Sequence, residues 1–406
     1  MPAAAVASAW WRFPLGLVLL EIVVYLSQDM YLPALPRVQA SFGVGQSAAQ
    51  LSIAAWSLGA ALVQLFTGPL SDRLGRRAVL LAGVVGFGLA SAGCALGTAF
   101  GVFLVARVAQ GCAGVWALNA GYAAIHELFE SRTAIRIQAW ISGITLLAPA
   151  LGPALGALLM AAANWQAMFL LLAACAAALF APLRKWTPQS VDFAGRLPLT
   201  ARRVAADYLH LLRNLPLMCL LAVWCLVFAV TMVWTVAGPF MLRDADGGSR
   251  SFVWAQAYAC GSFVVGTRLV DRLLRLYPRA LLLGWALDGC LGGICLTLLA
   301  ALLRAPAALV VALFGVFMAG AGLLLSPLYR AVLERARQQM GLRVAWVSCG
   351  INLSGALACA LAAALELAEL RSFAAISLLA LLAASALARS RRGLHAEPQP
   401  DELAGG

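Results

Sequence analysis

Long apolar stretches separated by short polar ones run through the whole chain. A helix needs about 20 apolar residues to cross the roughly 30 Å hydrocarbon core of a bilayer. Twelve stretches meet this requirement, and each predicts a membrane-spanning helix. The predicted spans are residues 13–32, 50–69, 78–97, 101–124, 134–160, 165–183, 215–241, 251–269, 280–303, 306–328, 343–365 and 370–388. No cleavage-site pattern accompanies the first one, so we expect it to be retained and not removed as a signal peptide.

Composition excludes several classes of protein. Of the 406 residues, 63% are hydrophobic and 11% are charged, whereas soluble domains have about 45–50% and about 25%. Too few polar residues remain to cover a soluble protein of this length, which excludes a soluble enzyme, a nucleic-acid-binding module and a disordered chain. The ten Cys fall within predicted spans without a pairing pattern. We interpret them as small apolar residues and expect no metal site.

The net charge of +12 follows the predicted topology. With the N-terminus placed in the cytoplasm, most of the 29 Lys and Arg residues fall in loops on the cytoplasmic side. Such a bias sets the orientation of a multi-pass protein. We therefore predict that both termini are cytoplasmic and that the protein lies in a bacterial-type inner membrane. The positive charge is a topology signal, and nucleic acid is not an expected partner.

The longest polar stretch separates six predicted spans from six. Near the end of the second span stands Gly68-Pro-Leu-Ser-Asp-Arg73, and a weakly similar Gly266-Thr-Arg-Leu-Val-Asp-Arg272 follows about 200 residues later. We predict an all-α membrane fold of twelve helices in two pseudo-symmetric six-helix bundles, a layout typical of secondary transporters. The predicted parts are an N-terminal bundle 1–183, a cytoplasmic loop 184–214, a C-terminal bundle 215–389 and a cytoplasmic tail 390–406.

Three ionisable residues of the first half are predicted to lie deep inside spans, namely Glu21, Asp29 and Arg107. Each costs about 2.5–3.5 kcal/mol at a helix centre, so a function or a compensating contact is expected. Glu21, Tyr25 and Asp29 are spaced four residues apart and share one broad helical face with Gln28. Burial disfavours the charged form of a carboxyl group, so these acids can carry a proton through a transport cycle. A buried ion pair that only fixes helix packing is the alternative.

Further candidates come from the other spans. Asp288 is a fourth acid predicted to be buried, either as a secondary functional site or as a hydrogen-bonding group between helices. Aromatic residues of the fourth and seventh spans could stack on planar substrates or serve only in packing. The candidates for a substrate cavity beyond the first span are Gln110, Trp116, Asn119, Trp224 and Trp234.

Three motifs carry a family resemblance. Gly68-Pro-Leu-Ser-Asp-Arg-Leu-Gly-Arg-Arg77 is similar to the loop 2–3 signature of the major facilitator superfamily, and Arg107-Val-Ala-Gln-Gly111 resembles its span 4 motif. Ala148-Pro-Ala-Leu-Gly-Pro-Ala-Leu-Gly156 resembles its antiporter motif, although Ala139, Ala148 and Ala157 stand where that pattern has Gly. Small residues allow close helix approach, and a proline bends the helix. The residues given a conformational role are Gly68, Asp72, Arg73, Gly75, Arg76, Arg77, Pro149, Gly152, Pro153 and Gly156, with Asp72 and the arginines expected to form charge pairs.

Within the superfamily, residues 13–30 and 121–130 are similar to the MdfA-type multidrug/proton antiporters, with His126 in place of Gln. The resemblance implies a twelve-helix alternating-access exporter for lipophilic, often cationic, molecules, and we expect the protein to be a monomer. It assigns Glu21 and Asp29 to proton and substrate coupling and Arg107 to a supporting charge, and it places the span of Asp288 at the periphery. We expect the proton gradient as the energy source, no cofactor, and drug-like small molecules, protons and the lipid bilayer as partners.

Other functions remain open at this point. A proton symporter or an exporter for a small metabolite would also use the deep carboxylates, although the span 5 pattern disfavours symport. An intramembrane hydrolase or lipid transferase would need a nucleophile with a base, or paired acids on facing helices, and no such dyad is visible, so no enzymatic activity is expected. A scaffold or receptor would have no need of an unmatched acid in the middle of the membrane.

Overall fold

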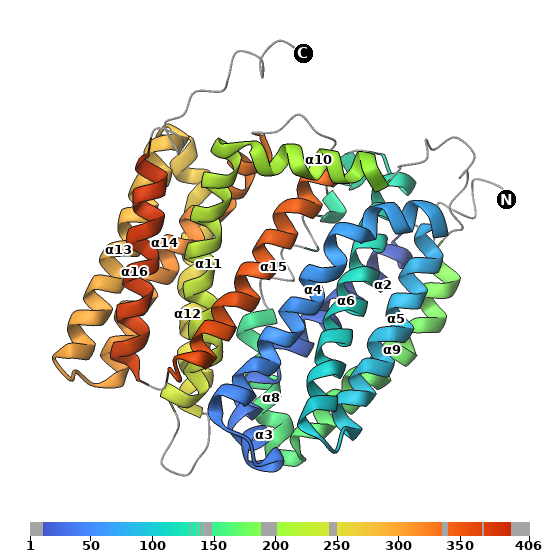
Figure 1. The fold of residues 1–406 in the computed structure, drawn as a ribbon, viewed down its shortest axis with the longest axis horizontal. Coiled ribbons are helices and arrows are strands. Elements are labelled where there is room, and N and C mark those ends of the chain that lie inside the picture. Colours follow the sequence, from blue (N-terminus) through green and yellow to red (C-terminus); the bar gives the residue numbers. More distant parts are fainter. Residues whose placement is uncertain are drawn as a thin grey trace. The chain divides into compact units, whose positions relative to one another are not determined.

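The computed structural model describes residues 11–130, 132–134, 136–138, 141, 148–187, 201–242, 250–334, 340–367 and 369–390, and these ranges contain helices and no strand (Figure 1). Ten helical segments of the described chain are long and apolar enough to cross a membrane. The other two predicted spans are 134–160, of which the structure describes the second part as the apolar helix α8 (Ala148–Ala162), and 251–269, which forms α12 (Arg250–Leu274) and carries more polar residues. The prediction of an all-α membrane fold is confirmed.

The chain forms two compact units, which we call the N-half (residues 1–45 and 51–198) and the C-half (46–50 and 199–406). The N-half contains α2 (Arg12–Asp29), η1 (Leu32–Ala34), α3 (Leu35–Phe42), most of α4 (Gln46–Leu74), α5 (Arg76–Leu96), α6 (Phe100–Leu128), α8 and α9 (Trp165–Trp186). The C-half contains α10 (Ala201–Arg213), α11 (Leu215–Met241), α12, α13 (Arg279–Leu302), α14 (Ala307–Glu334), α15 (Met340–Ala364) and α16 (Leu370–Arg389).

Several helices extend beyond the predicted spans. Helix α4 continues to Leu74, five residues past its predicted end at 69, and α10 forms a helix within the stretch predicted as a loop. The predicted ends follow from the apolar stretches alone, whereas a helix can continue through polar residues beyond the hydrocarbon core of the bilayer. Helix α4 stops at Gly75, whose φ of +89° is readily adopted only by glycine, and α5 starts directly after it.

Within the N-half, α4 and α6 cross at a pair of reciprocal glycines. A Cβ atom on Gly59 would lie 2.1 Å from the carbonyl oxygen of Val108, and one on Gly111 would lie 2.1 Å from that of Trp56. Both distances are far below a van der Waals contact, so only glycine fits. The two backbones therefore touch directly, as is common where membrane helices associate through small residues.

The C-half repeats this crossing between α12 and α14. A Cβ on Gly266 would lie 2.0 Å from the carbonyl oxygen of Ala319, and one on Gly322 would lie 2.1 Å from that of Phe263. In each half the second and fourth spans are thus joined by two glycines that face each other's backbone. This shared packing device supports the pseudo-symmetry expected from the sequence.

Candidate functional site

Helix α2 carries both predicted coupling acids, and both are buried. The exposed fraction is 4% for Glu21 and 8% for Asp29. Asp29 is the last residue of α2, and the chain continues through the 3₁₀ turn η1 instead of the single helix predicted for residues 13–32. Pro33 lies in this turn and has no N–H to continue the helical hydrogen bonds. The second acid therefore occupies a helix end.

The face of α2 that bears Glu21 is partly open. Tyr25 and Gln28 on this face are half-buried, as the sequence pattern predicted. From α6, Tyr122 forms a side-chain hydrogen bond with Glu21 and also lies near Tyr25. Sequence reasoning missed Tyr122, although its three-residue spacing from Asn119 was visible. Contact with α6 is therefore part of the environment of Glu21.

Two predicted cavity residues lie on the same side of α6 as Tyr122. Trp116 and Asn119 are half-buried and are three residues apart, and Tyr122 follows after three more. The indole nitrogen of Trp116 is buried without a hydrogen-bond partner among the described residues. This stripe of α6 supplies an aromatic ring, an amide and a phenol, and the phenol of Tyr122 lies beside the acid-bearing face of α2.

Arg107 of α6 lies in the interior of the N-half. It is fully buried, and its Nε donates to the carbonyl oxygen of Ser52 at 3.2 Å. Its Nη1 donates to the carbonyl oxygen of Ser27 at 2.9 Å and to Oε1 of Gln110 at 2.6 Å. Gln110 in turn donates to Ser91 Oγ at 2.8 Å, so a polar network links α2, α4, α5 and α6. Gln110 is fully buried in this network, which corrects its prediction as a residue that lines a substrate cavity.

Aromatic rings complete the surroundings of Arg107. Its guanidinium carbon lies 5.1 Å from the ring centroid of Tyr31 and 5.7 Å from that of Phe169, within the range of cation–π attraction. Among the described residues, the partners of Arg107 are carbonyl oxygens, an amide and these rings, and neither Glu21 nor Asp29 is one of them. The alternative of an ion pair between Arg107 and one of these acids does not occur in this structure.

Helix α8, which carries the antiporter-like motif, packs directly on the end of α2. A Cβ on Gly152 would lie 2.6 Å from Cβ of Asp29, and one on Gly156 would lie 1.9 Å from the carbonyl oxygen of Met30. Pro153, between these glycines, is buried inside the helix. The structure thus brings the predicted motif residues and the predicted coupling acid into contact. Sequence spacing alone gave no sign of this contact.

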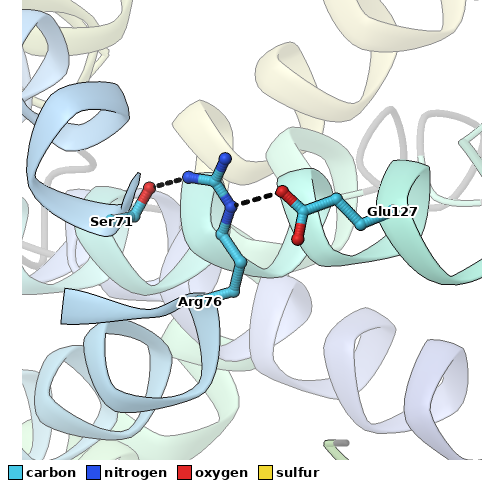
Figure 2. Close-up of polar contacts among 3 residues, drawn as sticks. All are labelled: Ser71, Arg76 and Glu127. Carbon is cyan, nitrogen blue, oxygen red and sulfur yellow. Dashed lines mark hydrogen bonds and ion pairs between the residues drawn. The ribbon is translucent and has the colours of Figure 1, made fainter. Parts of the chain in front are cut away.

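The loop 2–3 signature forms a polar cluster at one end of the N-half. Arg76 donates from Nε to Oε1 of Glu127 at 3.0 Å and also hydrogen-bonds Ser71 Oγ, so it joins the ends of α4, α5 and α6 (Figure 2). Arg77 donates to the carbonyl oxygen of Arg184 at 2.6 Å. The sequence predicted charge pairs of these arginines with Asp72, whose side chain lies outside what the structure describes, and missed Glu127.

Removal of the Arg76–Glu127 pair is expected to have a modest effect on stability. The side chains are 12% and 30% exposed, so the pair is partly screened by solvent. A double-mutant cycle with Arg76→Gln and Glu127→Gln should give a coupling energy of about 0.5–1 kcal/mol. Reversible unfolding in mixed detergent measures it, and a coupling energy of zero would show that the contact is not stabilising.

The C-half candidates divide into buried and accessible residues. Trp234 is 2% exposed, stacks on Phe314 with ring centroids 4.5 Å apart, and donates to Oε1 of Gln256 at 2.8 Å. It is a core residue, which corrects its prediction as a substrate contact. Trp224 is half-buried and donates to the carbonyl oxygen of Leu325 at 3.1 Å, so its ring remains partly accessible.

Asp288 is not the buried acid that the sequence predicted. Its side chain is 53% exposed and forms an ion pair with Arg389, whose side chain is 62% exposed. Apolar neighbours in the sequence suggested burial, but in a membrane span they are equally suited to face lipid.

The remaining motif residues are Gly68 and Arg73 in the last turns of α4 and the half-buried Pro149 in the first turn of α8. Within the described chain, no three His, Cys, Asp or Glu residues group as metal ligands.

Comparisons with known proteins agree with this architecture. The profile described as Major Facilitator Superfamily matches residues 17–359. Multidrug resistance protein MdtM of Salmonella typhimurium is 35% identical over 264 residues, covering 65% of this chain and 64% of that protein, so the match spans less than two thirds of the relative. Multidrug transporter MdfA of Edwardsiella ictaluri is 31% identical over 332 residues, covering 81% and 80%.

Two solved structures share the fold. The D-xylose-proton symporter superposes with a TM-score of 0.71 at 15% identity, covering 93% of this chain and 97% of that one. The human organic anion transporter MFSD10 (TETRAN) gives a TM-score of 0.69 at 19% identity, covering 95% and 100%. At these identities the likeness concerns the fold alone.

Proposed function

This chain belongs to the major facilitator superfamily, and from that premise we propose that it is a proton-coupled antiporter that exports lipophilic small molecules, cationic or neutral. We place it in a bacterial inner membrane, as a monomer with both termini in the cytoplasm and the proton gradient as its energy source. The names of the relatives, multidrug resistance protein and multidrug transporter, support drug-like substrates.

One observation carries the proposal: two buried acids lie on α2, and neither is paired with Arg107. A guanidinium in contact with a carboxylate would hold that carboxylate in its charged form. Arg107 is instead bound to carbonyl oxygens and Gln110. Glu21 and Asp29 are therefore suited to exchange a proton during the cycle, while Arg107 stabilises the packing around the acid-bearing helix.

The cycle follows from competition between proton and substrate. In the outward-open state a proton binds Asp29 or Glu21 and displaces the drug. The return to the inward state then releases the proton to the cytoplasm. Because Asp29 touches Gly152 of α8, a change of charge on this acid acts directly on the contact between α2 and α8.

Substrate contacts are proposed for the accessible polar and aromatic side chains. In the N-half these are Tyr25 and Gln28 of α2 and Trp116 and Asn119 of α6, all half-buried. Their rings can stack on planar molecules and attract cations. In the C-half, Trp224 offers the same chemistry.

Uptake into inverted membrane vesicles tests the function. A fluorescent planar cation such as ethidium should accumulate inside vesicles whose lumen is acidified, and a protonophore should abolish the accumulation. Vesicles without the protein serve as the control. Accumulation that requires protons to move in the same direction as the substrate would identify a symporter and contradict the proposal.

A further inference from the structure

The outer face of α13 carries a charge pair that the transport cycle does not use. Asp288 lies nine residues after Arg279, about 14 Å along the helix, in a segment with no other acidic or basic residue up to Leu302. Arg389, the last residue of α16, donates from Nη2 to Oδ1 of Asp288. Helices α13 and α16 pack side by side within the C-half (Figure 1). Both are apolar and long enough to span a membrane, and the two side chains of the pair are 53% and 62% exposed, so they are expected to face lipid.

The pair leaves polar groups unsatisfied. A guanidinium has five N–H donors and a carboxylate has acceptor positions on both oxygens. Among the described residues, Asp288 and Arg389 bond to each other, and no further protein hydrogen bond is made by either side chain. Polar groups that face hydrocarbon without partners are costly. An external molecule with complementary charges would therefore be favoured at this position.

Aromatic residues beside the pair indicate the level of the lipid headgroups. Trp285 lies one turn before Asp288 on the same face of α13 and is 50% exposed. The ring of Tyr277 meets it edge-on, with centroids 4.9 Å apart. Exposed Trp and Tyr residues are enriched at membrane interfaces. On the other side, a Cβ added to Gly289 or Gly292 would meet nothing within 4 Å, so the helix surface next to the pair is open.

We propose that the Asp288–Arg389 pair binds the headgroup of an aminophospholipid. The lipid phosphate accepts hydrogen bonds from the free N–H groups of Arg389, and the primary ammonium of the headgroup donates to Asp288. A phosphatidylcholine headgroup carries the same two charges, but its quaternary ammonium has no N–H to donate. The site therefore distinguishes two lipids of equal charge by the donors on their nitrogen.

Lipid binding to the purified full-length protein tests this directly. Native mass spectrometry measures retention of four lipids with identical acyl chains: phosphatidylethanolamine, its N-methyl and N,N-dimethyl derivatives, and phosphatidylcholine. Retention should fall as methyl groups replace hydrogens on the nitrogen. Phosphatidylethanolamine and phosphatidylcholine should differ by about tenfold, which corresponds to the free energy of one charge-assisted hydrogen bond. Equal retention of all four lipids by the wild-type protein would overturn the proposal without recourse to any variant.

Variants locate the site. Asp288→Asn should remove the preference for phosphatidylethanolamine, whereas Arg389→Gln should lower the retention of all four lipids, because all four carry the phosphate. Arg371→Gln is the matched control, because Arg371 forms a similarly exposed ion pair with Glu369 at the other end of α16, and it should keep the preference. A preference that survives Asp288→Asn, or that is lost in Arg371→Gln, would contradict the assignment. If the wild-type protein showed no lipid preference and a variant of the pair changed the ratio of monomer to dimer, this face would be a contact between two copies instead.

Discussion

Replacement of Asp29 by Asn is expected to abolish gradient-driven accumulation of drug while leaving passive exchange intact. One proton moved across 100 mV supplies about 2.3 kcal/mol, enough to hold a neutral drug at about a 50-fold concentration ratio. Asn keeps the shape of the side chain but cannot carry the proton, so the ratio should fall to about one. Proteoliposomes with an imposed proton gradient measure this accumulation.

Counterflow separates a coupling role from a structural one. Exchange of labelled for unlabelled drug needs substrate binding and alternating access but no net proton movement, so Asp29→Asn should still support it. Glu21→Gln tests the second acid in the same two assays. Asp271→Asn, at an exposed position on α12, is the control for the same chemical change. If the double variant Glu21→Gln/Asp29→Asn still accumulated drug along the gradient, the coupling assignment would be wrong.

Substitution of Gly156 by Ala is expected to destabilise the N-half, although alanine is a better helix former. In an open helix this change is favourable by up to about 1 kcal/mol. Here the new Cβ would lie 1.9 Å from the carbonyl oxygen of Met30, so α8 would have to move away from α2. Overpacking of this kind typically costs about 1–3 kcal/mol. Because Asp29 precedes Met30, drug accumulation should fall as well.

The control for this change is Gly289→Ala, where a Cβ meets nothing within 4 Å. That variant should be neutral or slightly stabilised, since it gains helix propensity without a clash. Thermal unfolding in detergent compares the two. Equal behaviour of both variants would mean that the close approach of α8 and α2 does not contribute to stability.

Apolar length and charge placement were sufficient to predict the helical membrane fold, because the bilayer constrains every span in the same way. They also identified Glu21, Asp29 and Arg107 as buried, since ionisable residues in spans are rare. The direction in which each side chain points was harder to predict. The predicted depth of Arg107 in the membrane would allow an ion pair with an acid of α2, yet its guanidinium binds the carbonyl oxygens of Ser27 and Ser52.

The same limit explains the errors in the C-half. Trp234 and Asp288 both lie in apolar helices, and the pattern around them does not say which neighbour each one faces. In the structure the side chain of Trp234 is buried in the interior of the C-half, whereas that of Asp288 is exposed on its surface. Such choices depend on contacts between helices far apart in sequence, as the contact between Gly152 and Asp29 also does.

The glycine crossings of α4 with α6 and of α12 with α14 have a practical consequence for spectroscopy. Backbones in direct contact cannot slide without losing that contact, so each crossed pair should move as one rigid unit through the transport cycle. The distance between spin labels on the two helices of one pair should then stay constant and serve as an internal reference. Any distance change measured elsewhere could be calibrated against it, which would separate motion of a whole half from bending within it.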